Sequence, residues 1–373
     1  MIVNDEHLQG RLFEFFHYLH THPETSWNEY GTTQYIKQFL DSEGVRYRLF
    51  DDCPGIVAEM GSGKPVVMVR ADMDALWQEV DGEFRANHSC GHDAHMTIVM
   101  GLILRLKMLQ WEQGTVRFLF QPAEEKGGGA LKMVEKGVID DVDYLFGIHL
   151  RPSEELSLKQ ASPSIRHGAA KFLVGHIEGF DCHGARPHQG VNAIDVISLI
   201  NFQLKNIYFS PQQSYSVKMT RCVAGGESLN IIPGSAQFAL DVRAETNVLL
   251  QQIKQKVEKI IQHAETMGVR ISYKWVDFVP AAEVSAEAER CIQKGIIAVL
   301  GKGGCAPSLR TSGSEDFHFY TIKRPHVKAA MLGLGANLKP GLHHPHMTFD
   351  RSCLLDGVRI LEVAVMEALK ERV

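Results

Sequence analysis

The chain has 373 residues, of which 45% are hydrophobic and 22% are charged, a composition that excludes a disordered or fibrous protein. Its length exceeds what one ordinary hydrophobic core requires, so we expect two domains. The formal net charge of -5 gives no basic surface for a phosphate backbone, and we therefore expect no nucleic-acid partner.

Disulfides, a membrane partner and an export signal are not expected either. The seven cysteines are odd in number and scattered, without the spacing of a disulfide framework. No apolar run suits a transmembrane helix, and residues 1–6 lack a basic segment followed by an apolar one. The sequence therefore predicts a cytoplasmic protein.

The N-terminal third alternates helical patterns with short apolar runs. Helices are expected over residues 6–20, 30–40 and 94–109, and buried strands over residues 65–70, 115–120 and 144–148. Such alternation predicts a largely parallel sheet covered by helices.

The pattern changes at about residue 169 and returns at about residue 283. The segment between them has the order β, α, β, β, α, β, typical of a small split α+β unit of the ferredoxin-like kind. Its alternating runs are residues 171–177 and 236–242, and its helices residues 193–208 and 247–267. After it we expect a helix over residues 286–300, a strand over 329–333 and a helix over 350–371. The fold class is therefore α/β: a discontinuous catalytic domain, residues 1–168 and 283–373, interrupted by an α+β domain, residues 169–282.

Potential metal ligands follow each predicted strand of the first domain. They are Asp72, Asp74, Glu124, Glu125, His149, His343 and His344. In open α/β sheets the crevice outside the carboxyl ends of the strands binds ligands. We therefore expect these distant segments to converge there.

Two short motifs add chemical detail. Cys90 and His92 can both face one metal ion from a glycine-containing turn; alternatively they are a buried thiol and part of a helix cap, since a single pair lacks the spacing of a zinc finger. The adjacent Glu124 and Glu125 point in different directions, so one can bind metal while the other exchanges protons with water and a leaving amine. The alternative is a solvated acidic pair.

These motifs together resemble the amidohydrolase branch of the aminoacylase and carboxypeptidase metallohydrolases, which includes hippurate hydrolase, indole-acetyl-amino-acid hydrolase and N-acetyldiaminopimelate deacetylase. The matching segments run in order along nearly the whole chain. They are LHTHPE (19–24), RADMDAL (70–76), CGHD (90–93), QPAEE (121–125), GIH (147–149), ARPH (185–188), NIIP (230–233), GSEDF (313–317) and HHP (343–345).

The resemblance implies two divalent metal ions, which ligand type allows to be zinc, manganese, cobalt or nickel. The implied ligands are Cys90, His92, Glu125, His149 and His343. It also implies that Glu124 acts as general base and then acid, and that the catalytic carboxylate Asp74 orients groups beside the metal site.

For residues 169–282 the resemblance implies a lid and dimerisation domain, through which the chain could form a homodimer. His183 then steadies the oxyanion, within one chain or across the dimer. Asn230 and Arg243 hold the α-carboxylate of the substrate, a group that an arginine fork fits well. From the residues alone, His183 and Asn230 could equally be turn residues, and Arg243 a surface charge.

The implied activity is hydrolysis of the amide bond of a small-molecule N-acyl amino acid or similar conjugate. A metallo-dipeptidase or carboxypeptidase and a non-catalytic metal-dependent binding protein are the alternatives. Trp77 stands where relatives carry proline, and the loop of residues 77–87 is shorter than theirs. The acyl group and the amino acid therefore do not transfer from any relative.

Overall fold

The computed structural model describes residues 5–109, 111 and 113–371, which form two compact units. Unit 1 comprises Met1–Arg166, Glu283–Arg310 and Glu315–Val373, and unit 2 comprises His167–Ala282 and Thr311–Ser314. The first four residues, on which the expectation of no export signal partly depends, lie outside the described residues. Within the described part of the chain, no helix is both long and apolar enough to cross a membrane.

Unit 1 is built on a seven-stranded sheet whose central strands are parallel. Its order is β1 (Arg46–Leu49), β2 (Ile56–Ser62), β6 (Gly114–Gln121), β3 (Val66–Asp72), β7 (Tyr144–Pro152), β17 (Lys328–Leu338) and β8 (Ala161–Ser162). The pairs β6–β3, β3–β7 and β7–β17 are parallel, and the outer pairs are antiparallel. This confirms the expected α/β fold with a mostly parallel sheet.

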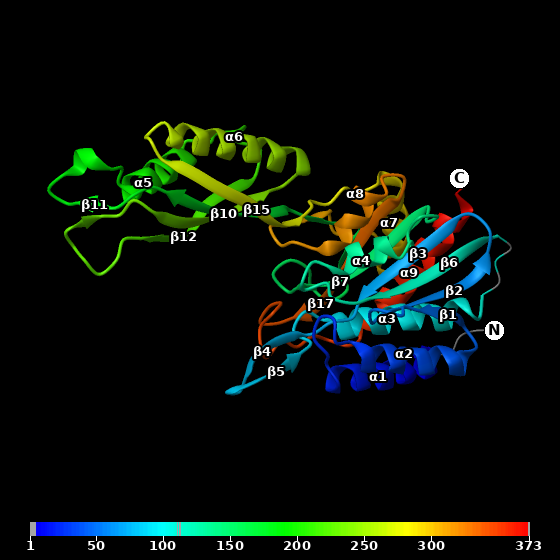
Figure 1. Ribbon diagram of the computed structural model, residues 1–373. Coiled ribbons are helices and arrows are strands. Elements are labelled where there is room, and N and C mark those ends of the chain that lie inside the picture. Colours follow the sequence, from blue (N-terminus) through cyan, green and yellow to red (C-terminus); the bar gives the residue numbers. More distant parts are fainter. Residues whose placement is uncertain (1–4, 110, 112, 372–373) are drawn as a thin grey trace. The chain divides into compact units, whose positions relative to one another are not determined.

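Helices cover both faces of this sheet, which explains why every residue of β3 is buried. The helices are α1 (Asp5–Thr21), α2 (Tyr30–Glu43), α3 (His92–Leu106), α4 (Gly129–Glu135), α7 (Ala286–Leu300), α8 (Phe319–Lys323) and α9 (Cys353–Lys370). Figure 1 shows α1, α2 and α3 on one side of the strands and α4 and α8 on the other. Because α3 packs against β3, α1 and α9, nearly all of its side chains are buried.

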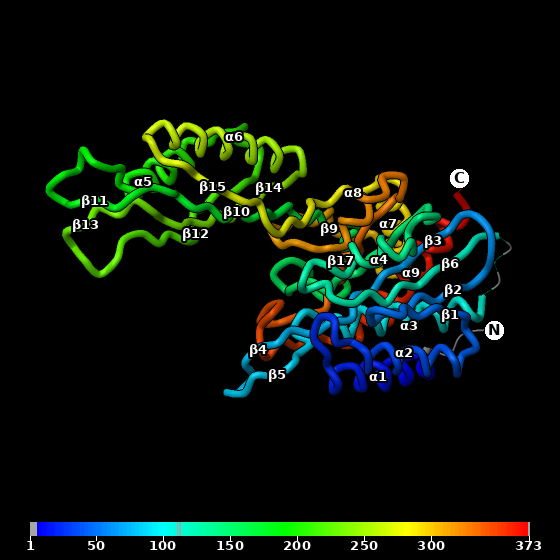
Figure 2. Tube along the Cα trace, in the orientation of Figure 1, coloured from blue at the N-terminus to red at the C-terminus, as the bar shows by residue number. Residues whose placement is uncertain are grey.

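Unit 2 has a separate hydrophobic core between a four-stranded antiparallel sheet and two helices. Along the chain its elements are β10 (Ala169–Glu178), α5 (Ala193–Leu204), β12 (Tyr215–Ala224), β14 (Ala236–Ala244), α6 (Asn247–Glu265) and β15 (Arg270–Val279). The sheet order is β12-β14-β10-β15, and α5 and α6 lie together on one face (Figure 1). In Figure 2 the short strands β11 (Cys182–His183) and β13 (Ile231–Ile232) run side by side. The order of the six elements is the one that the sequence predicts.

The loop expected over residues 77–87 is instead a hairpin of β4 (Leu76–Val80) and β5 (Glu83–Asn87). Its two turn residues, Asp81 and Gly82, have φ angles of 55° and 84°. Positive φ at both central residues is typical of the tight turns that join hairpin strands, and Asp-Gly favours them. The signal for this hairpin was therefore present in the sequence.

Two glycines should respond oppositely to alanine. A Cβ on Gly295 of α7 would lie 2.4 Å from the carbonyl oxygen of Ile360 in α9, whereas a Cβ on the exposed Gly10 of α1 would meet nothing within 4 Å. Gly295→Ala should lower the free energy of unfolding by about 1–3 kcal/mol through overpacking. Gly10→Ala should raise it by about 0.5–1 kcal/mol. Thermal unfolding of both variants checks this, and a Gly295→Ala protein that melts no lower than wild type contradicts the packing.

Candidate metal centre

The candidate centre lies where the parallel strands of unit 1 end. β3, β6, β7 and β17 are neighbours, so the residues at their carboxyl ends meet at one edge of the sheet. Glu125 follows β6, His149 lies in β7, and His343 follows β17. Cys90 and His92 come from the turn that begins α3. The five side chains implied as ligands are therefore contributed by four separate segments.

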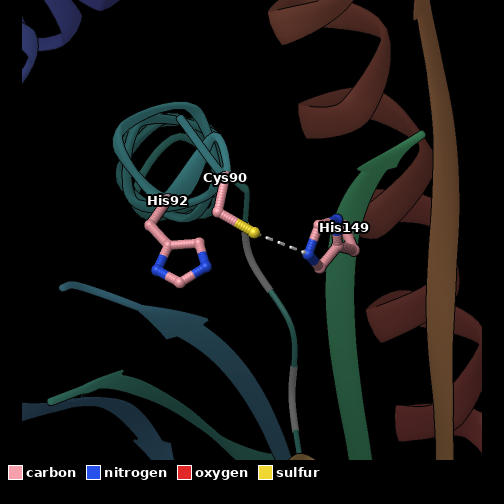
Figure 3. Close-up of side chains that lie close together, drawn as sticks. All are labelled: Cys90, His92 and His149. Atoms are coloured by element: carbon pink, nitrogen blue, oxygen red, sulfur yellow. Dashed lines mark hydrogen bonds between the residues drawn. The ribbon is translucent and has the colours of Figure 1, made fainter. Parts of the chain in front are cut away.

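The structure brings these five side chains together. The Sγ atom of Cys90 lies 3.6 Å from Nε2 of His149 and 3.3 Å from Nε2 of His343 (Figure 3 draws the first contact). Oε1 of Glu125 lies 3.4 Å from Nε2 of His343 and 3.8 Å from Nε2 of His92. Cys90, His92 and His149 form one group, and Cys90, Glu125 and His343 a second. Cys90 belongs to both, which suits a pair of ions rather than one.

His149 is oriented for metal binding by its own backbone. Its Nδ1 lies 2.7 Å from the carbonyl oxygen of Leu150 and so must carry the hydrogen, which leaves the lone pair on Nε2 directed at Cys90. Burial, together with the charges of His95 and Arg151, holds the pKa of His149 well below its usual range. The imidazole therefore stays neutral, as a ligand must.

Several buried polar atoms of the site have no hydrogen bond within the described residues. They are both ring nitrogens of His92 and Oε1 of Glu125. Such atoms are rare in folded proteins because each carries an uncompensated desolvation cost. A cation bound at Nε2 of His92 and Oε1 of Glu125, which lie 3.8 Å apart, would remove that cost for both atoms, while Nδ1 of His92 faces Asp74 at 3.3 Å. The donor set of thiolate, imidazole and carboxylate also fits a divalent transition metal better than calcium or magnesium. The residues present thus fit the implied metal pair.

Asp72, His92 and His95 form another group whose side chains could bind a metal ion. The hydrogen bonds of His95, however, leave it no free ligand atom. Nδ1 of His95 lies 2.7 Å from Asp72, and its Nε2 accepts the N–H of Leu150 at 3.0 Å. Both nitrogens of His95 are occupied, so it supports the strand that carries His149. His95 is not among the residues predicted for the site, although its position one helical turn after His92 was an available signal.

Asp74 lies beside the centre and binds the backbone that carries the glutamate pair. It accepts the N–H of Glu124 at 3.1 Å and that of Glu125 at 3.0 Å. Ser26 donates to the same carboxylate at 2.6 Å, and Nδ1 of His92 lies 3.3 Å away. Asp74 therefore contacts three parts of the site: Ser26, the backbone of the glutamate pair and the first residue of α3.

Arg70, an unexpected cation in an apolar strand, is fully buried behind the centre. Its guanidinium donates to Asp72 at 2.6 Å, to Asp316 at 2.9 Å and to Glu315 at 3.1 Å. Glu315 and Asp316 adjoin Glu124. Burial, and then the charges of Glu315, Glu125 and Asp316, raise the pKa of Glu124 well above its usual range. A raised pKa suits a group that must both take and return a proton near neutral pH.

The other three predicted residues lie in unit 2. His183 is exposed on β11, where its Nδ1 accepts the N–H of Ala185 at 3.0 Å. Asn230 directly precedes β13, whose Ile231 pairs with His183, and the carbonyl of Asn230 accepts the N–H of Gly184 at 2.7 Å. Arg243 lies on β14 and donates to Asp241 at 3.1 Å and to the carbonyl of Ser312 at 3.3 Å. The segments that carry His183 and Asn230 are therefore adjacent through their backbones, whereas Arg243 lies on a different strand.

Known proteins share both the sequence pattern and the fold. A model of peptidase family M20/M25/M40 matches residues 68–367. The chain is 29% identical to an N-acetylcysteine deacetylase of Bacillus subtilis over 98% of the chain and 100% of that protein. It is 31% identical to an IAA-amino acid hydrolase of Arabidopsis thaliana over 89% of the chain and 79% of that protein. A solved dinuclear metal binding peptidase of the M20 family from Bacillus subtilis superimposes with a TM-score of 0.82 at 27% identity, covering 97% and 98% of the two chains.

Metal affinity should rise with pH. Contacts with Cys90 and Glu125 raise the pKa of His343 to about 10, so this imidazole is protonated in the metal-free protein and must lose its proton to become a ligand. Between about pH 6 and about pH 8, affinity should increase roughly tenfold per unit for each proton released. Isothermal titration calorimetry in buffers of different ionisation enthalpy counts those protons.

The histidine doublet supplies a matched control for this measurement. His343→Gln should weaken metal binding and remove one released proton, whereas His344→Gln should change neither. His344 is exposed, and its Nδ1 accepts the N–H of His346 at 3.1 Å. If His344→Gln gives the larger loss, the assignment of His343 is wrong.

Proposed function

Because the chain belongs to peptidase family M20/M25/M40, we propose that it is a two-metal amidohydrolase that cleaves the amide bond of N-acyl amino acids or similar small conjugates. The family membership confirms the resemblance that the motifs indicate. One observation carries the proposal: Cys90, His149, His343 and Glu125 converge around unsatisfied polar atoms of His92, with Glu124 adjacent. The names of the relatives, a deacetylase and an amino acid hydrolase, support this type of bond.

The bound ions would supply positive charge for the developing oxyanion and lower the pKa of the attacking water. Glu124 does the proton transfer. It shares a group with His92 and Glu125, and its raised pKa lets it accept a proton from water and return it to the departing amine. Asp74 keeps both glutamates in place through their backbone N–H groups. Zinc, manganese, cobalt and nickel are all compatible with these ligands.

The roles proposed for unit 2 rest on the resemblance. We propose that His183 steadies the oxyanion and that Asn230 and Arg243 bind the α-carboxylate of the substrate. A homodimer through residues 169–282 is part of this proposal. It is supported by the edge strand β12, which leaves Val223 53% exposed. Light scattering of the purified protein measures the oligomeric state directly.

Glu124→Gln should separate proton transfer from metal binding. Glutamine keeps the size of the side chain but cannot accept a proton, so kcat should fall at least ~100-fold, the scale of general acid–base catalysis, while the metal content stays unchanged. Glu135→Gln, on the exposed surface of α4 in the same unit, is the control and should retain wild-type kinetics. Near-normal turnover by Glu124→Gln refutes its role.

A substrate panel should distinguish the proposed activity from its alternatives. N-acetyl, N-benzoyl and indole-acetyl amino acids should be cleaved faster than dipeptides, and chelation should abolish the activity until a divalent transition metal is returned. Faster cleavage of dipeptides would favour a metallo-dipeptidase or carboxypeptidase. Metal-loaded protein that is inactive on the whole panel would favour a metal-dependent binding protein.

A further inference from the structure

The segment that carries Glu124 and Glu125 adopts a conformation that needs support from elsewhere. This segment, residues 122–130, is called the Glu124 loop. Ala123 is fully buried and has a φ of 53°, a backbone conformation that residues other than glycine rarely adopt. The loop then folds back tightly: the N–H of Gly129 donates to the carbonyl of Ala123 at 3.1 Å. A strained residue of this kind persists only where surrounding contacts impose it.

Carboxylates from other segments provide those contacts. Glu29 accepts the N–H of Ala123 at 2.7 Å, and Asp74 accepts the next two N–H groups, those of Glu124 and Glu125. At the far end of the loop Asp316 accepts the N–H of Ala130 at 2.8 Å. The three consecutive N–H groups that set the direction of the glutamate pair are therefore all held by carboxylate oxygens.

Among these carboxylates, Glu29 is buried without a compensating charge from the described residues. Its side chain is 0% exposed, and none of the described cations pairs with it. Its Oε2 atom has no hydrogen-bond partner among those residues either. Burial and the charge of Asp74 raise the pKa of Glu29 to about 8. Although Glu29 precedes α2, its side chain does not cap that helix. Neither an ion pair nor a helix cap accounts for a carboxyl group at this position.

The backbone of Glu29 is itself rigid, as a positioning group requires. Its carbonyl accepts the hydroxyl of Thr33 at 2.6 Å and the N–H of the same residue at 3.0 Å. Thr33 in turn accepts the N–H of Gly55 at 2.9 Å. Three residues earlier in the same turn, Ser26 donates to Asp74. One turn of the chain, residues 25–29, therefore supports both carboxylates that hold the Glu124 loop.

We propose that Glu29 is a positioning residue: by holding the N–H of Ala123 it imposes the left-handed conformation that directs Glu124 toward the reacting amide and Glu125 toward the metal. The inference rests on the proposed function for the role of Glu124. The effect that we infer for Glu125 can be tested by metal binding alone. Glu29 acts through the backbone of the loop alone and touches neither substrate nor metal.

Substitution by methionine and by glutamine tests the proposal. Glu29→Met keeps the length of the side chain but lacks an acceptor oxygen, whereas Glu29→Gln keeps an oxygen for Ala123 and resembles the neutral acid. Glu29→Met should lose about 10- to 100-fold in kcat with little change in KM, and a similar factor in metal affinity, the range found when groups that orient ligands are removed. Glu29→Gln should restore both quantities to near wild type.

Glu24 supplies the matched control. It belongs to the same turn region, but its carboxylate accepts the N–H groups of Gly31 and Thr32 in α2 and does not touch the Glu124 loop. Glu24→Met should lower the melting temperature without altering kcat or metal affinity, all assays being run well below that temperature. A purely structural Glu29 would behave in the same way.

Measuring both kcat and metal affinity separates this inference from the proposed function. Wild-type kcat and metal affinity in Glu29→Met would overturn the positioning role while leaving the amidohydrolase activity intact. If the wild-type protein cleaves no substrate of the panel but Glu29→Met still binds metal more weakly and Glu29→Gln does not, the positioning role stands and the proposed function fails. Loss in both Glu29 variants alike would also overturn the role, because an acceptor oxygen would then not suffice.

Discussion

The buried guanidinium of Arg70 is the interaction on which unit 1 depends. It holds Asp72 at the end of β3 and, 245 and 246 positions along the chain, Glu315 and Asp316. Carboxylates this close together in the interior repel one another, and an uncompensated charge there costs several kcal/mol. One fully buried cation therefore lets distant acidic segments meet. Asp72 extends the network through His95 to the N–H of Leu150, so the same cation supports the strand that carries His149.

The chemistry of the candidate centre arises from unequal surroundings rather than from unusual residues. His149 is kept neutral by burial, whereas His343, more exposed and beside Cys90 and Glu125, has a raised pKa and would have to release a proton before it could bind a metal ion. Glu124, next in sequence to Glu125, is surrounded by other acids and holds its proton more tightly. Neighbouring side chains of the same type thus receive different tasks from their environments.

Part of the local backbone strain of the described residues lies in the same region. Trp27, Ala123 and His343 all have positive φ angles without being glycine. Trp27 lies in the turn of residues 25–29, Ala123 in the Glu124 loop, and His343 is itself one of the candidate ligands. Such conformations cost of order 1–3 kcal/mol each and persist where surrounding structure determines them. The hydrogen bonds from Glu29 and Asp74 to the Glu124 loop are part of that surrounding structure. In the proposed role they set the direction of the Glu124 and Glu125 side chains as well as the stability of the loop.

Most of the central elements, and the chemical types of the side chains at the centre, could be predicted from the sequence alone. Apolar runs with period two or continuous burial, and helical runs with period 3.6, are local properties, so the parallel sheet of unit 1 and the six elements of unit 2 could be predicted from them. Motif order likewise indicated a thiol, imidazoles and paired carboxylates. Three features required the folded chain: His343 rather than His344 faces Cys90, both nitrogens of His95 are occupied, and Glu29 reaches Ala123. Each of these depends on contacts between residues tens to hundreds of positions apart, and no local pattern encodes the direction in which a side chain points across a packed core.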